Sequence, residues 1–397
     1  MRVLWFFICL FFITLETQAQ DCGLLEPFSN CDIADADLMA GNLKHLSCRI
    51  DKVKPDRVIW VDQLGGDFTT INAAMGAIGT DLAEATSDAP VLIRLGPGRH
   101  EIDSTLTVKD HVYVQGSGRE VTEVVCAPEK TCGYLFQANN VRTRISDMTI
   151  SAARYAVRSF QNTFGNDCHV EITNVSINLV ATGTFPPTGV DAIRCNSIYL
   201  RDVQISADAY GASSFWGVYT SGNGTVKTEN LSIYGGGASA QNVGVYAAAN
   251  GFDNHIGLDI NVTGGGQNGN AFAYYLLGTG GATPPSRIRD SSLTAVGGGR
   301  NLGAYVGAAT PSSMQVLNSV IYAGNAPNNN RAAMYCQIPL EGSSPQVMVG
   351  HSTVNSTFDT NQDNGNAFCF RCAFVWNYLS DAGIAGEELD FSCATGN

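Results

Sequence analysis

The sequence is poor in charge, and basic residues are the scarcer kind. Only 15% of the 397 residues are charged, and acidic residues outnumber basic ones 36 to 23, for a formal net charge of −13. No run of Lys and Arg is present, so the basic patch typical of proteins that bind nucleic acid or anionic membranes is missing. We therefore expect no nucleic-acid partner. The low charge and the 43 glycines also argue against a helical bundle or coiled coil.

Long hydrophobic runs are missing as well, except at the start. Met1-Arg2 is followed by the apolar stretch Val3–Leu15 and then by Thr17-Gln-Ala-Gln20. This stretch is shorter than the roughly 20 residues that a membrane span needs. A charged start, a short apolar run and a small residue near its end are typical of a secretory signal peptide. We predict a signal peptide over residues 1–20 and a secreted or extracytoplasmic protein without a membrane span.

The cysteine content fits export. Of 12 cysteines, Cys9 lies in the predicted signal peptide, and the odd remainder leaves at least one thiol unpaired or bonded to another chain. The one C-x-x-C motif, Cys369–Cys372, stands alone. In a strand its two cysteines would face opposite sides, which suits a shared metal poorly. We expect structural disulfides, no metal and no cofactor.

A repeat organises the chain between about residues 145 and 355. A polar anchor residue is followed, three positions later, by an aliphatic one, as in Asn174-Val-Ser-Ile177. The anchors recur with a period of about 28 residues, and some of the later intervals are slightly longer. Gly-, Asn- and Pro-rich stretches separate the repeats. The anchors are Asp147, Asn174, Asp202, Asn230, Asp259, Asp290, Asn318 and His351.

This period predicts an all-β solenoid. Repeats of roughly 20 to about 50 residues mark stacked architectures, and the absence of an amphipathic helical stripe excludes helical ones. The prediction is a parallel β-helix with three short strands per coil of about 28 residues, each coil resting on the last at about 4.8 Å. Ile177 and Ile205 should then lie directly above one another.

Two cysteine pairs share the repeat's spacing. Cys168 and Cys195 follow two consecutive anchors at equal distances along the chain, and so do Cys336 and Cys369. Equal offsets on consecutive coils bring Cα atoms to about 4.8 Å, inside the range of roughly 4.4–6.8 Å that disulfides adopt. We predict the bonds Cys168–Cys195 and Cys336–Cys369. Two further pairings with less support are Cys126 with Cys132 and Cys372 with Cys393.

The N-terminal part has a different pattern. Residues 58–61 and 91–95 have the composition of strands, and residues 70–85 have the spacing of an amphipathic helix with Asp67 as its cap. A helix over the first coil would cover the open end of a solenoid. The predicted organisation is a signal peptide at 1–20, a disulfide-pinned leader at 21–55, an N-terminal α-helical cap with the first coils at 56–125, β-helix coils at 126–355 and a C-terminal cap at 356–397.

The cap region carries a family resemblance. Three segments, Gly66-Asp-Phe-Thr-Thr-Ile-Asn-Ala-Ala74, Leu95-Gly-Pro-Gly-Arg-His-Glu101 and Val112-Tyr-Val-Gln-Gly-Ser-Gly-Arg119, resemble the opening of pectin methylesterases in the pectin-lyase-like superfamily. The resemblance is confined to this region, and beyond it only the repeat pattern is shared. It implies a right-handed parallel β-helix, secretion and a carbohydrate setting.

The catalytic segments of those esterases are not matched. The nearest counterpart, Gln161-Asn-Thr-Phe164, places Asn162 where the family has its acid, and an amide cannot release a proton. His100 replaces the tyrosine of the second segment. Asp191, in the slot where later coils place tyrosine, is a weak catalytic candidate, because polysaccharide cleavage generally uses two carboxylates.

Tyrosines recur near one point of five successive coils. Alternation along a strand would turn Tyr219, Tyr246 and Tyr305 outward, where rings can stack on sugar rings. The alternative is that the tyrosines only stack on each other. The full set of candidate substrate-binding residues is Tyr219, Tyr246, Tyr274, Tyr305 and Tyr335.

Three functions remain. The first is an exported monomer that binds a polysaccharide, or acts in a cell-surface or extracellular matrix, without a catalytic set. The second is a carbohydrate-active enzyme, pectinesterase-like or a polysaccharide lyase, with a divergent active site. The third is a structural or adhesive spacer. The missing acid, nucleophile and arginine favour the first and third over the second.

Overall fold

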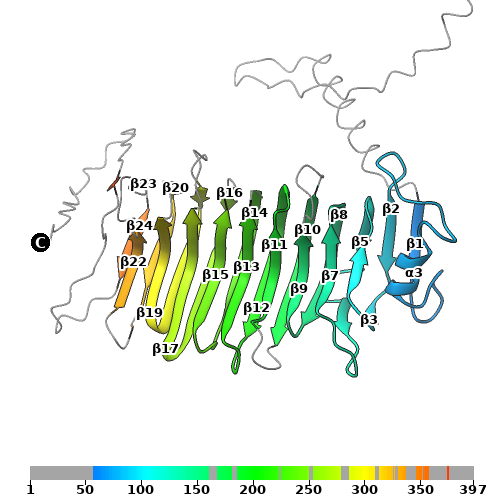
Figure 1. Cartoon of the computed structure of the whole chain (residues 1–397), viewed down its shortest axis with the longest axis horizontal. Coiled ribbons are helices and arrows are strands. Elements are labelled where there is room, and N and C mark those ends of the chain that lie inside the picture. The colour runs from blue at the N-terminus through cyan, green and yellow to red at the C-terminus, as the bar shows by residue number, and fades with distance from the viewer. Residues whose placement is uncertain are drawn as a thin grey trace, which may run out of the picture. The chain divides into compact units, whose positions relative to one another are not determined.

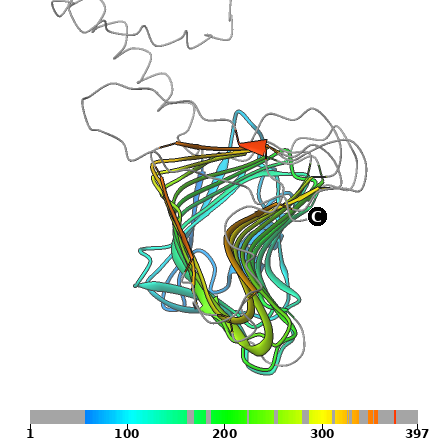
Figure 2. The same ribbon diagram turned by 90° about the vertical axis from the view of Figure 1, so that its left-hand side faces the viewer.

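A parallel β-solenoid forms the described part of the chain. The computed structural model describes residues 57–160, 168–180, 186–222, 225–249, 254–278, 286–308, 313–324, 326, 330–336, 346–350, 352–356 and 373–374. Within the unit that begins at Arg57, Figure 1 shows the strands side by side along the long axis, from β1 and α3 at one end to β22 and β24 at the other. Seen along that axis, the coils superpose as a three-sided figure (Figure 2). The predicted all-β solenoid is confirmed.

Each coil contributes to three ladders of parallel strands, which we call the first, second and third sheets in chain order. The first contains β1 (Arg57–Val61), β2 (Val91–Leu95), β5 (Val112–Gln115), the first parts of β8 (Arg142–Ala152), β10 (His169–Val180), β12 (Ser197–Asp208) and β14 (Thr225–Gly236), then β16 (Asn254–Ile256), β18 (Ser286–Arg289), β20 (Ser313–Leu317), β23 (Gln346–Gly350) and β25 (Ala373–Phe374).

The second sheet contains β3 (Gly98–Ile102), β6 (Thr122–Cys126), the second parts of β8, β10, β12 and β14, the first parts of β17 (Asp259–Gly278) and β19 (Ser292–Ala308), then β21 (Val320–Ala323) and β24 (Thr353–Ser356). The third contains β4 (Leu106–Val108), β7 (Tyr134–Asn139), β9 (Tyr155–Phe160), β11 (Thr188–Ile193), β13 (Ser214–Gly222), β15 (Gln241–Ala249), the second parts of β17 and β19, and β22 (Asn330–Cys336).

The core is a column of aliphatic side chains inside the three sheets. Ile177 pairs with Ile150 on one side and with Ile205 on the other, as the repeat predicts. The column continues through Ile233 and Ile260, and all five side chains are fully buried. Because alternate residues of each strand point inward, the same aliphatic row recurs in every coil.

The anchor residues make the corner between the first and second sheets. Asn174, Asp202 and Asn230 have φ angles of 53°, 53° and 56°, the left-handed region that Asn and Asp enter more readily than other side chains. Across this corner an amide pairs with the carboxylate one coil earlier. Asn174 Nδ2 donates to Asp147 Oδ1 at 2.8 Å, and Asn230 Nδ2 donates to Asp202 Oδ1 at 2.9 Å. These residues are therefore structural.

One predicted anchor is wrong. Asp259 pairs with Ser232 inside the second sheet, and Gly257, with φ 66°, holds the corner. A Cβ atom there would lie 2.9 Å from Asn230 Oδ1, so another residue would displace that side chain, whereas glycine adopts the positive φ angle without contact. The interval from Asn230 to Gly257 is therefore shorter than the interval from Asn230 to Asp259. The interval from Gly257 to Asp290 is correspondingly longer than the one from Asp259.

The N-terminal helix is shorter than predicted. α3 spans Ile71–Ala77, and Thr70, not Asp67, caps it, since Thr70 Oγ1 accepts from the Ala73 amide at 3.2 Å. Asp67 Oδ2 instead accepts from the Trp60 amide. The helix ends at Ala77, and Gly79, with φ 81°, follows in the left-handed region that is typical after a helix C-terminus. The predicted strands at 58–61 and 91–95 are present as β1 and β2, while a capping role for α3 stays a prediction.

Two disulfides join described residues. Cys168 and Cys195 link consecutive coils with Cα atoms 5.0 Å apart, which confirms the predicted bond. Cys126 and Cys132 form the second disulfide and close a short loop. The predicted partners Cys369, Cys372 and Cys393, the leader and the signal peptide lie outside the described residues, so the Cys336–Cys369 bond stays a prediction.

Candidate functional site

The outer face of the third sheet is unusual because its strands bend. In β13 two consecutive residues, Gly217 and Val218, both face the core. A Cβ atom on Gly217 would lie 2.7 Å from the Ile233 side chain, and Val218 is fully buried. The neighbours Trp216 and Tyr219 therefore both point outward and converge, with ring centroids 5.3 Å apart. The side that bows inward in Figure 2 is consistent with this bend.

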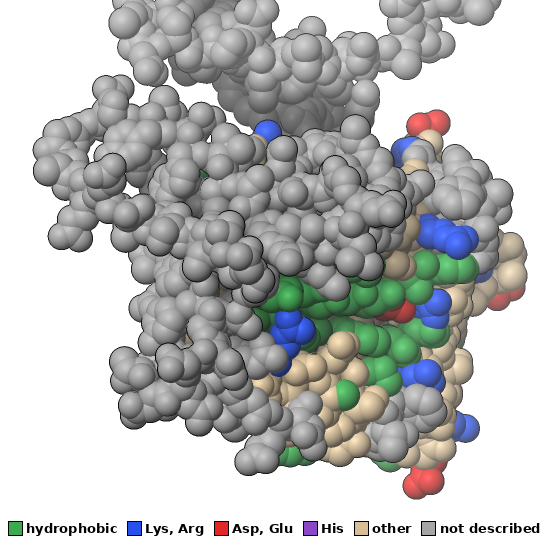
Figure 3. Space-filling model, turned by 60° about the vertical axis from the view of Figure 1, so that its left-hand side comes forward, with side chains coloured by type: hydrophobic (Ala, Val, Ile, Leu, Met, Phe, Trp, Pro, Cys, Tyr) green, Lys and Arg blue, Asp and Glu red, His purple; other side chains and the backbone are tan. Residues whose placement is uncertain are grey.

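Two columns of outward side chains follow this bend across the coils. They form a hydrophobic cluster separate from the core, visible in Figure 3 as parallel rows of hydrophobic side chains with basic groups beside them. We call this surface the aromatic strip. One column contains Trp216, Val243, Phe272 and Leu302, and the other contains Tyr219, Tyr246, Tyr275, Tyr305 and Tyr335.

The second column is a continuous stack of five tyrosine rings. Successive centroids, from Tyr219 to Tyr335, lie 5.0, 4.9, 4.3 and 5.5 Å apart, with interplanar angles between 9° and 20°. Burial, the largest cause, raises the pKa of Tyr246 and of Tyr275 to about 12. The four tyrosines predicted at 219, 246, 305 and 335 are thus brought together.

The fifth predicted tyrosine does not belong to the stack. Tyr274 is fully buried inside the solenoid, and its hydroxyl lies 3.2 Å from His255 Nε2. His255 in turn contacts Thr228 Oγ1 at 3.0 Å, and complete burial lowers the pKa of His255 to about 3. In the ladder Tyr274 pairs with the inward Val245 and Ala304, whereas Tyr275 pairs with Tyr246 and Tyr305 and takes the outward position.

Within the stack, neighbouring tyrosines cover the faces of the inner rings. Tyr246, Tyr275 and Tyr305 each have a neighbouring ring on both sides, so a sugar ring cannot lie flat on them. On the side of Tyr219 that points away from Tyr246, the adjacent slot of the column holds Asp191 and no stacked ring. The end of the stack at Tyr219 is therefore the part of the strip best suited to contact a ligand.

At the Tyr219 end, the positions that continue the tyrosine column hold the charged residues Asp191 and Arg158. Asp191 pairs with Tyr219 on one side and with Arg158 on the other, so it occupies the tyrosine slot as the sequence predicts. Asp191 is only 5% exposed, and its Oδ2 lies 3.5 Å from Arg158 Nε. Burial raises the pKa of Asp191 to about 6, although the Arg158 charge acts in the opposite direction.

Polar atoms around Asp191 have no hydrogen-bond partner. Thr188 and Trp216 pair in the adjacent column, and buried Thr188 Oγ1, Trp216 Nε1 and Arg158 Nε are all unsatisfied. No hydrogen bond joins the Asp191 carboxylate to another described residue either. We call Arg158, Thr188, Asp191 and Trp216 the polar quartet. Unpaired buried polar groups are rare in folded proteins and call for an explanation.

The quartet is chemically complementary to a hydroxyl group. Arg158 and Trp216 offer N–H donors, and the Asp191 carboxylate is an acceptor. Because Arg158 Nε and Asp191 Oδ2 lie 3.5 Å apart, one ligand hydroxyl can accept from the arginine and donate to the carboxylate. For metal binding the residues are unsuitable, since no group of three or more His, Cys, Asp or Glu converges anywhere in the described chain.

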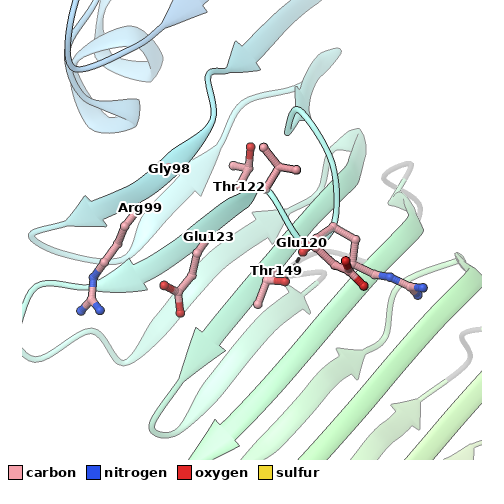
Figure 4. Close-up of a pocket in the computed structure, with 8 residues that line it drawn as sticks. Gly98, Arg99, Glu120, Thr122, Glu123 and Thr149 are labelled. Carbon is pink, nitrogen blue, oxygen red and sulfur yellow. Dashed lines mark hydrogen bonds between the residues drawn. The ribbon is translucent and has the colours of Figure 1, made fainter.

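A hollow lies on the second sheet near the N-terminal end, away from the quartet (Figure 4). It measures about 360 Å³ and is lined by Arg99, Glu120, Glu123 and Thr149, among others. Two of its polar groups already have partners within the protein. Glu123 accepts from Ser151 at 2.6 Å, and Thr149 donates to the Arg119 carbonyl. It therefore lacks the unsatisfied groups that distinguish the quartet.

Four residues of the site are absent from the sequence-based candidates: Arg158, Thr188, Trp216 and Tyr275. Trp216 stands three positions before Tyr219, and one period of the repeat projects it onto Thr188, its partner in the ladder. A register built from the coil lengths would have found both. Tyr275 depends on the exact length of its coil, and Arg158 on the long coil that separates it from Asp191. The anchor phrase reveals neither feature.

No protein-family model and no curated protein sequence matches the chain. Among solved structures it is similar to the pectin methylesterase from carrot, with 11% identity over 82% of this chain and 89% of that one and a TM-score of 0.42. It is also similar to the A-module of the mannuronan C-5 epimerase AlgE6 from Azotobacter vinelandii, with 14% identity, coverage of 78% and 95% and a TM-score of 0.34. It is similar as well to the catalytic domain of a GH87 α-1,3-glucanase, with 12% identity over 83% of this chain and 69% of that one and a TM-score of 0.42.

Pectin methylesterases are thus among the structural neighbours, and the parallel β-helix that the sequence resemblance implies is the fold observed. No helix among the described residues is long and apolar enough to cross a membrane.

Proposed function

We propose that this exported protein binds a polysaccharide on the outer face of the third sheet, with sugar hydroxyls seated at the polar quartet. The observation that carries the proposal is the set of buried polar atoms without a hydrogen-bond partner, Arg158 Nε, Thr188 Oγ1 and Trp216 Nε1, on the strands around a buried carboxylate that accepts no hydrogen bond from another described residue. An unsatisfied buried polar group costs about 1–3 kcal/mol. A site that keeps several such groups is arranged for a ligand that supplies the missing partners.

The strip supports the polymeric nature of the ligand. Tyr219 presents a ring face at the quartet, and an apolar ring with a polar tip is suited to a sugar, which has both kinds of surface. Beyond it, the tyrosine stack continues for four more coils. A chain that enters at the quartet can therefore extend along the edges of Tyr246 and Tyr275, which are partly exposed, as far as Tyr305, which is only 5% exposed.

The alternative function is catalysis on a carbohydrate, with Asp191 as an acid or base. Its pKa of about 6 favours proton exchange near neutral pH. However, Asp191 is the only carboxylate on the described strands of the third sheet, whereas glycoside cleavage generally uses two. Binding is therefore the better-supported function, and the same lack of a second acid leaves the esterase and lyase alternatives without a mechanism.

The test removes hydroxyl-binding groups without changing shape. Thr188→Val removes one oxygen and Trp216→Phe removes the indole N–H. Each should weaken retention in gels that contain soluble polysaccharides by about tenfold, the value of one good hydrogen bond. Because its hydroxyl is unsatisfied, Thr188→Val should leave thermal stability unchanged or raised.

The matched control is Trp60→Phe, since Trp60 is 45% exposed on the first sheet, outside the site. If no neutral or acidic polysaccharide is retained by the wild type, or if Trp60→Phe weakens retention as much as Trp216→Phe, the proposal is wrong and the spacer function gains support.

A further inference from the structure

We propose that a sugar hydroxyl bound at the polar quartet displaces the proton of Asp191, so that the protein holds carbohydrate at neutral pH and releases it on acidification. The inference rests on the proposed function and adds a regulatory property to the same site. It follows from how the Asp191 carboxylate is surrounded before and after a ligand arrives.

Without a ligand the ionised carboxylate is poorly supported. Two groups that titrate or carry charge face it from the strands on either side. Arg158 comes from β9, and its Nε lies 3.5 Å from Asp191 Oδ2, beyond good hydrogen-bond geometry. Tyr219 comes from β13 and brings no positive charge. The guanidinium of Arg158 is also shared, since it lies over the ring of Tyr134 at 4.6 Å and over that of Phe160 at 5.3 Å.

A bound hydroxyl changes this balance. A hydroxyl that donates to a carboxylate makes a charge-assisted hydrogen bond, roughly twice as strong as one between neutral groups. It therefore favours the ionised form of Asp191 over the protonated form. The opposing effect, further loss of water, is small because only 5% of Asp191 is exposed before the ligand binds. The hydrogen bond should outweigh the added burial.

The sign of the pH effect follows. Burial raises the pKa of free Asp191 to about 6, and the ligand should lower it. Between the two pKa values binding releases a proton, so affinity rises with pH and levels off above about pH 6. Within that window the proton competes with the ligand, and below it the affinity stays at a lower, constant value. A shift of one pKa unit corresponds to a tenfold change in affinity.

The experiment compares affinities at pH 5.0 and 7.5. The probe is hydroxyethyl cellulose, or whichever uncharged soluble glucan the gels show to be retained, because such a polymer has no group that titrates in this range. For a shift of one pKa unit, wild-type protein should bind about fivefold more tightly at pH 7.5. Asp191→Asn, which cannot ionise, should bind equally at both values. Thr188→Val should bind more weakly at both and keep the wild-type ratio.

Calorimetry supplies a second readout. At pH 5.5, the binding heat of the wild type should vary with the ionisation heat of the buffer in the sense of proton release, and that of Asp191→Asn should not. A wild-type affinity that is equal at both pH values, or a pH dependence that persists in Asp191→Asn, overturns this inference and leaves the proposed function standing. Absence of binding at every pH overturns both.

Discussion

At the scale of single residues, Asp191 differs most from what the fold alone would select. Its slot is a tyrosine in each of the next five coils of the column, where the ring contributes to a stable stack. A carboxylate in the same slot is buried beside a single distant cation. Groups held in an unfavourable state of ionisation are concentrated at functional sites, which agrees with the role proposed for the quartet.

Replacing Asp191 with Asn should stabilise the protein at neutral pH. The folded state holds the pKa of Asp191 at about 6, above its usual 3.8, so ionisation destabilises the fold as pH rises from about 4 to 6. Two units correspond to about 3 kcal/mol. The free energy of unfolding of Asp191→Asn, relative to wild type, should increase by about 2–3 kcal/mol between pH 4 and pH 7 in urea titrations.

A structural ion pair predicts the opposite sign. If Asp191 and Arg158 stabilised the fold through their charges, the Asn variant would lose stability at pH 7, where both residues are charged. Arg158→Gln tests the same point, because removing the cation should enlarge the cost of an ionised Asp191 and make the pH dependence of stability steeper.

Residue-level prediction from sequence succeeds where a slot is repeated and fails where the local backbone departs from the average coil. The tyrosine slot at 219, 246, 305 and 335 is recoverable because it recurs at near-constant spacing. Tyr274 is misplaced because it follows Tyr246 by one average period of about 28 residues, whereas the ladder pairs Tyr246 with Tyr275, one residue later.

At the scale of elements, the tyrosine stack is a cross-strand ladder of the kind that stabilises a sheet. Its rings lie 4.3 to 5.5 Å apart, close to the spacing of parallel strands. The strands therefore set the distance between rings, and the rings in turn hold neighbouring coils in register.

Interrupting the stack in its middle should cost more than trimming its end. Tyr246→Ala removes a ring with neighbours at 5.0 and 4.9 Å, and should lower the free energy of unfolding by about 2 kcal/mol, less than the roughly 3–5 kcal/mol of a fully buried aromatic residue. Tyr335→Ala, with Tyr305 as its neighbouring ring, should cost about half as much. Urea unfolding measures both.

Tyr210→Ala is the control, because Tyr210 is 78% exposed and its loss should be nearly neutral. Equal losses for Tyr246→Ala and Tyr210→Ala would show that the stack contributes nothing beyond surface packing.

Element boundaries were predictable to different degrees. The strands at 58–61 and 91–95 are hydrophobic and β-branched, and both are present. The helix predicted over 70–85 stops at Ala77 because Gly79 adopts a positive φ angle and Ile78 is extended. Ile78 and Leu82 have the apolar spacing of a helix, but in the structure they are joined by an isolated β-bridge.

At the scale of the whole molecule, the repeat made the architecture predictable. Stacking demands that positions one coil apart share an environment, and the aliphatic core positions, the corner residues and Cys168–Cys195 all obey that demand. The candidate binding site did not follow from the same rule, since it depends on differences between coils rather than on their likeness.

Because each coil touches only its neighbours, damage should stay local. Ile205→Ala removes a fully buried side chain from β12, which pairs with β10 and β14. We expect a loss of about 2–5 kcal/mol and faster hydrogen exchange in these three strands, with β1 and β2 unchanged. Val180→Ala, at a site 60% exposed on β10, is the control. Uniform acceleration across all coils would indicate a single cooperative unit instead.

The hydrogen-bonded pairs at the corner between the first and second sheets make Asp and Asn alternate from one coil to the next. Along that edge Asp147 precedes Asn174, and Asp202 precedes Asn230, each amide donating backward to a carboxylate. If the chain skipped the coil that contains Asn174 while it folded, Asp147 would lie next to Asp202. Two anions would then meet without a donor between them, and mutual repulsion would reject the misthreaded frame. We therefore expect the alternation to disfavour stacks in which one coil has been skipped.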